Sequence, residues 1–221
     1  MSLLVGCESS GTVRDAFRAR GIDAYSCDLL PDQSGSPYHI VGDVLDVIAS
    51  RHWDALIAHP PCTYLCCSAE WAYRDVQTKN IKPGTLTGAA RRAAREKALT
   101  FVFDLWNCGI DRLCIENPVG VINSRLSDMP KPQYIQPYDF GEDASKRTGL
   151  WIRGFPLLRR TRRIAGRQVE HNGKLVERWA NQTDSGQNRL GPSEDRWQIR
   201  SNTYPGIADA MADQWSRILE K

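Results

Sequence analysis

A short apolar run that turns directly into an amphipathic helix constrains the fold of this chain more than any other feature. Residues 2–5 are largely apolar, residues 6–11 form a Gly-Cys-Glu-Ser-Ser-Gly turn, and residues 12–20 place their apolar side chains on one helical face. Gly21 ends this helix, and a second strand follows at residues 23–27. A strand, a helix and a second strand in this order predict two parallel strands with the helix packed against the sheet.

The same alternation continues along the chain and indicates an α/β fold. Further strands are expected at residues 39–41, 53–58, 112–115, 133–136 and 150–152, and further helices at residues 45–50, 87–106 and 204–219. Residues 53–58 are almost continuously apolar, which is typical of a strand in the middle of a parallel sheet. The pattern therefore predicts a Rossmann-like sheet covered by helices.

Composition sets the class of protein. The chain has 221 residues, of which 41% are hydrophobic, enough for the core of one domain or of one domain with a small appendage. No apolar run is long enough to cross a bilayer, and the first residues do not resemble an export signal, so we expect a cytoplasmic protein with no membrane partner. The seven cysteines form no paired framework and are expected to be free thiols.

The glycine-rich turn and two acidic residues predict a nucleoside-binding edge of the sheet. Gly6 and Gly11 allow a ligand to lie against backbone amides at a helix N-terminus. Asp28 ends the second strand, where an acid usually binds ribose hydroxyls, and Asp43 follows the third strand, where it can accept from an adenine amine. No phosphate-binding loop is present, which favours a cofactor without phosphates. The alternative is a tight turn of the kind found in any α/β protein.

Cys62 is the candidate nucleophile. It follows the strand at residues 53–58, at the end where open α/β sheets bind ligands, and Pro60 and Pro61 stiffen its approach. A thiolate adds readily to electron-poor carbon. The alternative is that Cys62 is a small buried hydrophobic residue, which is the usual role of a free cysteine.

Glu116 is the candidate partner of Cys62 because it ends the strand that starts at residue 112. Attack by a thiolate at C6 of a pyrimidine makes C5 nucleophilic, and an acid that hydrogen-bonds to ring N3 stabilises the developing charge. This chemistry needs one thiolate and one carboxyl group facing one ring. Taken alone, Glu116 is better interpreted as a helix N-terminal charge or a salt-bridge partner, whereas the pair favours catalysis.

These motifs together resemble the cytosine-C5 DNA methyltransferase family, in particular the short versions carried by phages. The nucleophile motif of the family is present as Pro60-Pro61-Cys62, and its Glu-Asn-Val motif as Glu116-Asn117-Pro118. The remaining matches are the turn from Gly6 to Gly11, the acid Asp28, the pair Gly42-Asp43, and the segment Asn202-Thr203-Tyr204-Pro205 before the last helix. The matches are in unpermuted order and span most of the chain.

The resemblance implies S-adenosylmethionine as methyl donor and DNA as partner, with a cytosine flipped out of a double strand. In this reaction Cys62 attacks C6, Glu116 holds the base, and Arg147 reaches its O2. The cofactor-binding residues implied are Gly6, Cys7, Glu8, Ser9, Gly11, Asp28, Asp43, Pro60 and Asn202. The substrate-binding residues implied are Pro61, Asn117, Lys146, Arg159, Arg160, Arg162 and Arg163.

Several departures from the family pattern concern the substrate. The nucleophile motif usually continues with Gln, a small residue, Phe and Ser, whereas Thr63-Tyr64-Leu65-Cys66 stands here. We divide the chain into a catalytic core at 1–152, a reduced basic recognition insert at 153–200 and a returning segment at 201–221. So small an insert favours an alternative, the same reaction on a free nucleotide, RNA or a modified base. A further alternative is a catalytically silent nucleic-acid-binding protein, in which Cys62 would be dispensable.

A basic run and a cysteine cluster allow further interpretations. Residues 153–167 contain six arginines and no acid, which suits contact with a phosphate backbone but is also typical of a solvated surface. Cys62, Cys66 and Cys67 are close enough in sequence for zinc. A zinc site usually needs a second ligand pair at matched spacing, and the sequence offers none, so no metal is expected.

Overall fold

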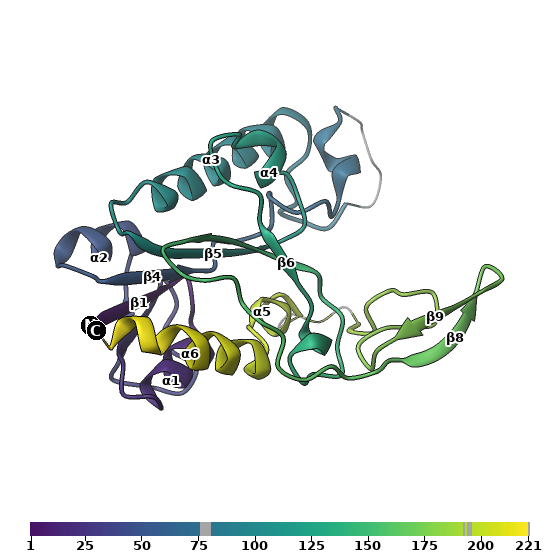
Figure 1. Ribbon diagram of the computed structural model, residues 1–221. Helices are drawn as coiled ribbons and strands as arrows, with labels where there is room; N and C mark the ends of the chain where they lie inside the picture. Colours follow the sequence, from purple (N-terminus) through teal and green to yellow (C-terminus); the bar gives the residue numbers. More distant parts are fainter. Residues whose placement is uncertain (76–80, 192, 194–195, 221) are drawn as a thin grey trace.

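A seven-stranded sheet organises the chain (Figure 1). The computed structural model describes residues 1–75, 81–191, 193 and 196–220, and its strands lie in the order β3-β2-β1-β4-β5-β7-β6. The strands are β1 (Ser2–Gly6), β2 (Asp23–Asp28), β3 (His39–Val41), β4 (Ala55–Ala58), β5 (Arg112–Pro118), β6 (Gln133–Ile135) and β7 (Thr148–Arg153). β7 pairs antiparallel with β5 and β6, and the pairs among β1 to β5 are parallel. The prediction of an α/β fold with a Rossmann-like sheet is confirmed.

Helices cover both faces of this sheet. They are α1 (Thr12–Arg18), α2 (Val44–Ser50), α3 (Gly88–Trp106), α4 (Ile122–Arg125), α5 (Arg196–Ser201) and α6 (Pro205–Leu219), with short 3-10 turns η1 (Glu70–Tyr73) and η2 (Pro137–Asp139). Figure 1 shows α1 and α6 on one face and α2 and α3 on the other. None of the helices in the described ranges is both long and apolar enough to cross a membrane.

The alternation of side chains along β1 builds two separate cores. Leu3 and Val5 belong to the core beneath α1 and α6, whereas Leu4 belongs to the core beneath α2 and α3. All three side chains are fully buried. Successive residues of a strand point to opposite faces, so a strand buried on both faces must be apolar at every position. This is why β1 and β4 have continuous apolar runs.

The sheet changes direction between β1 and β4. From β1 the chain winds outward through β2 to β3, and β4 then starts on the other side of β1. Gly6 and Ala58, the last residues of β1 and β4, are partners in this parallel pair. Ligands bind outside the carboxyl ends of the strands at such a point. The fold therefore brings the segment after Gly6 beside the segment after Ala58.

Part of residues 153–200 forms a separate hairpin that stands away from the body of the molecule (Figure 1). Its strands are β8 (Arg167–His171) and β9 (Lys174–Arg178). Asn172 and Gly173 form its turn with φ angles of 52° and 72°, the left-handed pair that a two-residue hairpin requires. We expected only a polar segment here, although Asn-Gly is a strong hairpin signal. Phe155 and Leu158, beyond the expected boundary at 152, belong to the core beneath α6.

We expect Gly11→Ala to destabilise the fold more than Gly21→Ala. Both glycines have positive φ, 71° and 78°, so an added Cβ costs about 1–3 kcal/mol of backbone strain in each. At Gly11 the new Cβ would also lie 2.1 Å from Nη2 of the buried Arg14, whereas nothing lies within 4 Å at Gly21. Urea unfolding of the two variants measures the difference, and equal losses of unfolding free energy would contradict the steric argument.

Candidate active site

Cys62 and Glu116 come together at adjacent strand ends. Cys62 lies in the turn after β4, where its carbonyl oxygen accepts from the N–H groups of Leu65 and Cys66, both at 3.0 Å. Glu116 lies near the end of β5, which pairs with β4. The Glu116 carboxylate is near enough to contribute to raising the pKa of Cys62, after a hydrogen bond to Cys66 and burial. The structure thus places the two residues at the ends of neighbouring strands.

The loop after β5 holds the Cys62 turn in place. Asn117 is 1% exposed, and its Nδ2 donates to the carbonyl oxygen of Pro60 at 2.7 Å. Val121 N–H donates to the carbonyl oxygen of Leu65 at 2.8 Å. A Cβ at Gly120 would lie 1.9 Å from that same oxygen, so only glycine fits between the two segments. Asn117, expected to bind substrate, instead contacts the proline turn in this structure.

Three groups surround the Glu116 carboxylate. His59 Nδ1 lies 3.2 Å from Oε2, and the side chains of His59 and Glu116 are 8% and 13% exposed. Burial opposes ionisation of Glu116, but hydrogen bonds from His59 and Thr148 and the charge of Lys146 hold its pKa below the usual value. Glu116 is therefore a carboxylate, a hydrogen-bond acceptor, in the free protein. We had expected Glu116 to act as an acid at ring N3, whereas the free protein holds it as an ionised carboxylate.

Cys62 and Cys66 share a hydrogen bond between their sulfur atoms. The bond and burial raise the pKa of Cys62. The same bond, with hydrogen bonds from the hydroxyl and N–H of Ser68, lowers the pKa of Cys66 to about 5. The first thiolate therefore forms on Cys66, and Cys62 is the thiol that donates to it. Sequence analysis considered Cys66 only as a metal ligand.

Lys146 takes the place that we expected for Arg147. The charge of Lys146 acts on both Cys62 and Glu116. Arg147 is exposed and lies over the ring of Tyr134 with its guanidinium 4.2 Å from the centroid. Successive residues entering a strand point to opposite sides, so only one of the two can face the site. The expected role of Arg147 at the base is not supported by its position.

The turn after β1 is fixed by Glu8. Cys7 has a φ angle of 57°, and Glu8 N–H donates to the carbonyl oxygen of Cys27 at 3.1 Å. The buried Glu8 carboxylate accepts from the N–H groups of Val13 at 2.7 Å and Arg14 at 3.3 Å. Glu8 thus satisfies the open N–H groups at the start of α1. Burial raises its pKa, although these bonds and the charge of His59 oppose that rise.

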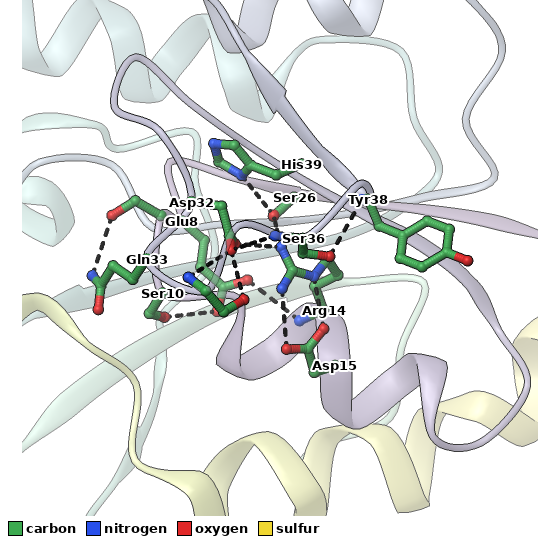
Figure 2. A network of polar contacts seen from close by, with 12 residues as sticks. Glu8, Ser10, Arg14, Asp15, Ser26, Asp32, Gln33, Ser36, Tyr38 and His39 are labelled. Atoms are coloured by element: carbon green, nitrogen blue, oxygen red, sulfur yellow. Dashed lines mark hydrogen bonds and ion pairs between the residues drawn. The ribbon is translucent and has the colours of Figure 1, made fainter.

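A buried arginine joins this turn to the loop after β2 (Figure 2). Arg14 is fully buried and donates to Ser26 Oγ at 2.8 Å and to Asp32 Oδ1 at 2.6 Å. Gln33 N–H donates to the carbonyl oxygen of Ser9 at 2.9 Å. The loop at residues 29–38 is therefore tied to both α1 and the glycine turn. Sequence analysis found neither Arg14 nor Asp32, because an arginine near a helix N-terminus usually points to solvent.

The expected cofactor acids lie around Cys7. Burial first, and then the charges of Asp28 and Asp43, raise the pKa of the Cys7 thiol. Asp28 Oδ1 accepts from the N–H of Leu30 at 3.0 Å, and Asp43 Oδ1 accepts from that of Leu45 at 2.8 Å at the start of α2. Each acid uses one carboxylate oxygen in this way. The ends of β1, β2 and β3 thus converge as predicted.

Asn202 is the expected cofactor residue that the structure does not join to the turn. It follows α5, and its N–H donates to the carbonyl oxygen of Gln198 at 3.3 Å. Among the described residues, no hydrogen bond connects its side chain to residues 6–11. The helix that follows, α6, packs against α1, so the returning segment does close onto the first helix.

The basic run is less free than its sequence indicates, because acids from elsewhere in the chain reach it. Arg160 and Arg163 form ion pairs with Asp139 at 3.4 and 3.6 Å, and Arg163 also pairs with Glu177. Ion pairs and carbonyl contacts also engage Arg167 and Arg153. The exposed Arg159 and Arg162 remain the better candidates for phosphate contact. In the described ranges no cluster of three or more His, Cys, Asp or Glu is suited to a metal ion.

Comparisons with known proteins add little beyond this geometry. No protein-family model matches the sequence, and no curated protein matches it. Among solved structures, a mutant of Spodoptera frugiperda DNMT2 matches with a TM-score of 0.43 and 15% identity. The match covers 74% of this chain and 54% of the other, so this chain spans about half the length of that protein. Activity and substrate are therefore argued from the residues of this chain.

Asp32→Asn is expected to lower the free energy of unfolding by about 3 kcal/mol at neutral pH, because it leaves buried Arg14 with one carboxylate fewer. Burial opposes ionisation of Asp32, but bonds from Ser34, Ser36 and Arg14 hold its pKa well below the usual value. Such a group stabilises the folded state above the unfolded-state pKa of about 4, and the contribution is lost as the pH falls below it.

Urea unfolding across this pH range tests the expectation for Asp32. The exposed Asp104→Asn in α3 is the control and should change little at any pH. A difference between Asp32→Asn and the parent that stays constant down to strongly acidic pH would contradict the ion-pair account.

Cys66→Ser is expected to remove the thiolate that forms near pH 5 in the parent protein, where the pKa of Cys66 is about 5. The pKa of Cys62 should then fall toward its usual value, because the sulfur that accepts its proton is gone. Ultraviolet absorbance of thiolates against pH measures both changes. Cys67→Ser is the control, since Cys67 is exposed, and an acid-side thiolate that persists in Cys66→Ser would contradict the pairing.

Proposed function

We propose that this protein is an S-adenosylmethionine-dependent methyltransferase that methylates C5 of a cytosine flipped out of double-stranded DNA. The observation that carries the proposal is the placement of Cys62 and Glu116 at the ends of the adjacent strands β4 and β5, where the charge of Glu116 acts on the Cys62 thiol. A pyrimidine becomes nucleophilic at C5 when a thiolate adds at C6 and a hydrogen-bonding group stabilises the charge of the ring. The two residues supply these two groups.

The first turn suits a cofactor that carries no phosphate. The side chain of Glu8 already accepts from the N–H groups of Val13 and Arg14 at the start of α1, so these donors are not open to a phosphate. Asp28 and Asp43 lie around Cys7 and offer carboxylate oxygens for ribose hydroxyls and an adenine amine. This set of groups fits S-adenosylmethionine, which supplies a methyl group when bound.

In the proposed reaction each residue of the site has a separate role. Cys62 passes its proton to the Cys66 thiolate, and the Cys62 sulfur then bonds to C6 of the base. The Glu116 carboxylate accepts from the exocyclic amine of the base, and it hydrogen-bonds to ring N3 once a proton lies between them. Lys146 lies near both reacting groups and balances the negative charge of the thiolate and the carboxylate. The buried Asn117 keeps the proline turn against β5, which fixes the position of the thiol.

A second candidate is the same reaction on another pyrimidine, such as a free nucleotide, RNA or a modified base. The observation in its favour is that Arg160, Arg163 and Arg167 are paired with acids, which leaves fewer arginines for a DNA backbone. A carboxylate at Glu116 also accepts equally well from the amine of cytosine and from N3–H of a uracil ring. A catalytically silent nucleic-acid-binding protein is the outcome if Cys62 is dispensable.

Labelled S-adenosylmethionine tests the proposal when it is incubated with the protein and, separately, duplex DNA, single-stranded DNA, RNA and dCMP. We expect label in cytosine of the duplex and a covalent complex with a duplex that contains 5-fluorocytosine. Cys62→Ala should abolish both, because it removes the sulfur that adds to C6 of the base. Cys67→Ala, at an exposed position of the same loop, should retain both.

Two results would overturn parts of this proposal. Methyl transfer by Cys62→Ala at the parent rate would remove Cys62 from the mechanism. Label in RNA or dCMP but not in the duplex would keep the mechanism and replace the substrate.

A further inference from the structure

Two cysteines lie at the two ends of a single turn in the loop after β4. The N–H groups of Leu65 and Cys66 both donate to the carbonyl oxygen of Cys62 at 3.0 Å, so a bond from residue 66 to residue 62 closes the turn. A turn of this kind separates its end Cα atoms by about 6 Å. Disulfides span about 4.4–6.8 Å between Cα atoms. The backbone of the turn is therefore compatible with a disulfide.

The side chains complete this geometry. The sulfur atoms of Cys62 and Cys66 are near enough to share a hydrogen bond. Both residues are partly exposed, whereas Cys27 and Cys114 are buried. A disulfide between the two sulfur atoms thus needs rotation of side chains that already face each other rather than a rearrangement of the loop.

Neighbouring elements hold this turn in place. Cys66 forms an isolated antiparallel bridge with Gly120 of the loop after β5. The carbonyl oxygen of Tyr64, inside the turn, accepts from Arg95 Nε of α3 at 2.9 Å and from the hydroxyl of Tyr73 at 3.0 Å. The buried Arg95 is only 8% exposed. The two sulfur atoms are therefore brought together by the fold and not by a freely moving loop.

We propose that Cys66 is an oxidation site and that hydrogen peroxide joins it to Cys62 in a reversible disulfide. Reactive cysteines of this kind are accessible and lie next to a second cysteine that resolves the first oxidation product. Formation of the disulfide does not depend on the proposed function. The loss of methyl transfer that follows does rest on it, because the disulfide takes up the sulfur that adds to C6 of the base.

The reaction balances with peroxide as the oxidant. The Cys66 thiolate attacks one oxygen of hydrogen peroxide, the O–O bond breaks and hydroxide leaves, so that Cys66 becomes a sulfenic acid. The Cys62 sulfur then bonds to the Cys66 sulfur, and the hydroxyl group leaves as water with the proton of Cys62. Both sulfur atoms are oxidised, and the peroxide is reduced to one water and one hydroxide. An added dithiol reverses the reaction by two exchange steps and is itself oxidised to a disulfide.

The surroundings of the sulfur atoms assign the first step to Cys66. Its hydrogen bond with Cys62 and, against the effect of burial, further bonds from the hydroxyl and N–H of Ser68 lower its pKa to about 5. Burial instead raises the pKa of Cys7 and Cys114. Because the thiolate is the reactive form, peroxide should attack Cys66 at neutral pH before the buried thiols.

Peptide mapping tests the disulfide without any substrate. The reduced full chain is treated with hydrogen peroxide, its remaining thiols are alkylated, and chymotrypsin is used to cut after Tyr64 or Leu65, between the two cysteines. We expect a link between the peptides that carry Cys62 and Cys66, and its loss on treatment with dithiothreitol. Cys67→Ser, at the exposed neighbouring cysteine, should keep the link, whereas Cys66→Ser should not form it.

The pH dependence of link formation gives a second test. The rate should be nearly constant from pH 6 to pH 8, because a thiol with a pKa of about 5 is ionised throughout this range. A thiol with the usual pKa of about 8.5 would instead react about 10-fold faster for each pH unit. Methyl transfer to duplex DNA should be lost as the link forms and return with dithiothreitol, in the parent and in Cys67→Ser alike.

The outcomes separate the oxidation site from the proposed function. A link from Cys62 to Cys67, or irreversible oxidation of Cys66 without a link, would overturn the oxidation site. A rate that rises steeply from pH 6 to pH 8 would also contradict it. A parent chain that forms the link but methylates no substrate keeps the oxidation site and overturns the proposed function. Methyl transfer that persists in the linked protein would likewise remove Cys62 from the proposed reaction.

Discussion

Backbone hydrogen bonds between β1 and β4 continue one residue past the last strand pair, where His59 N–H donates to the carbonyl oxygen of Gly6 at 2.9 Å. This bond places the proline turn beside the glycine turn at the point where the sheet changes direction. The thiols, Glu8 and His59 depend on it for their positions. Because the two strands are fully buried, their register cannot slip without moving apolar side chains to the wrong face.

The charged and acidic groups of the site are stabilised by the neighbours that this placement gives them. Buried carboxylates and thiols are costly unless they are paired, and three of the groups here have a donor or a positive neighbour. Glu8 has the first N–H groups of α1, Glu116 has His59 and Lys146, and Cys66 has Cys62. Glu116 and Cys66 thus have lowered pKa values in a partly buried site, where electrostatic interactions are stronger than in water.

The sequence allowed the sheet, most helices and the placement of Cys62 and Glu116 at the ends of neighbouring strands to be predicted. Strand-end residues are predictable because parallel strands end at one edge, and the apolar period gives the strands themselves. The sequence led us to expect Arg147 at the base, but the charge of Lys146 acts on the site instead. Which of two neighbouring residues faces a site depends on the direction of the strand that follows, and the sequence does not specify it. The ion pairs of Arg160 and Arg163 join residues distant in the chain, which no local pattern reveals. His59 and Cys66 were missed because their significance lies in a neighbour's charge.

The glycine at position 120 has a consequence for motion. Its backbone lies so close to the carbonyl oxygen of Leu65 that no side chain fits between them, and the N–H of Val121 donates to that same oxygen. The loops that carry the thiol and the carboxylate are therefore in direct backbone contact. Neither loop can move outward without carrying the other. The two reacting groups therefore belong to one rigid unit, and entry of a nucleobase has to be accommodated by the surrounding segments rather than by separation of sulfur from carboxylate.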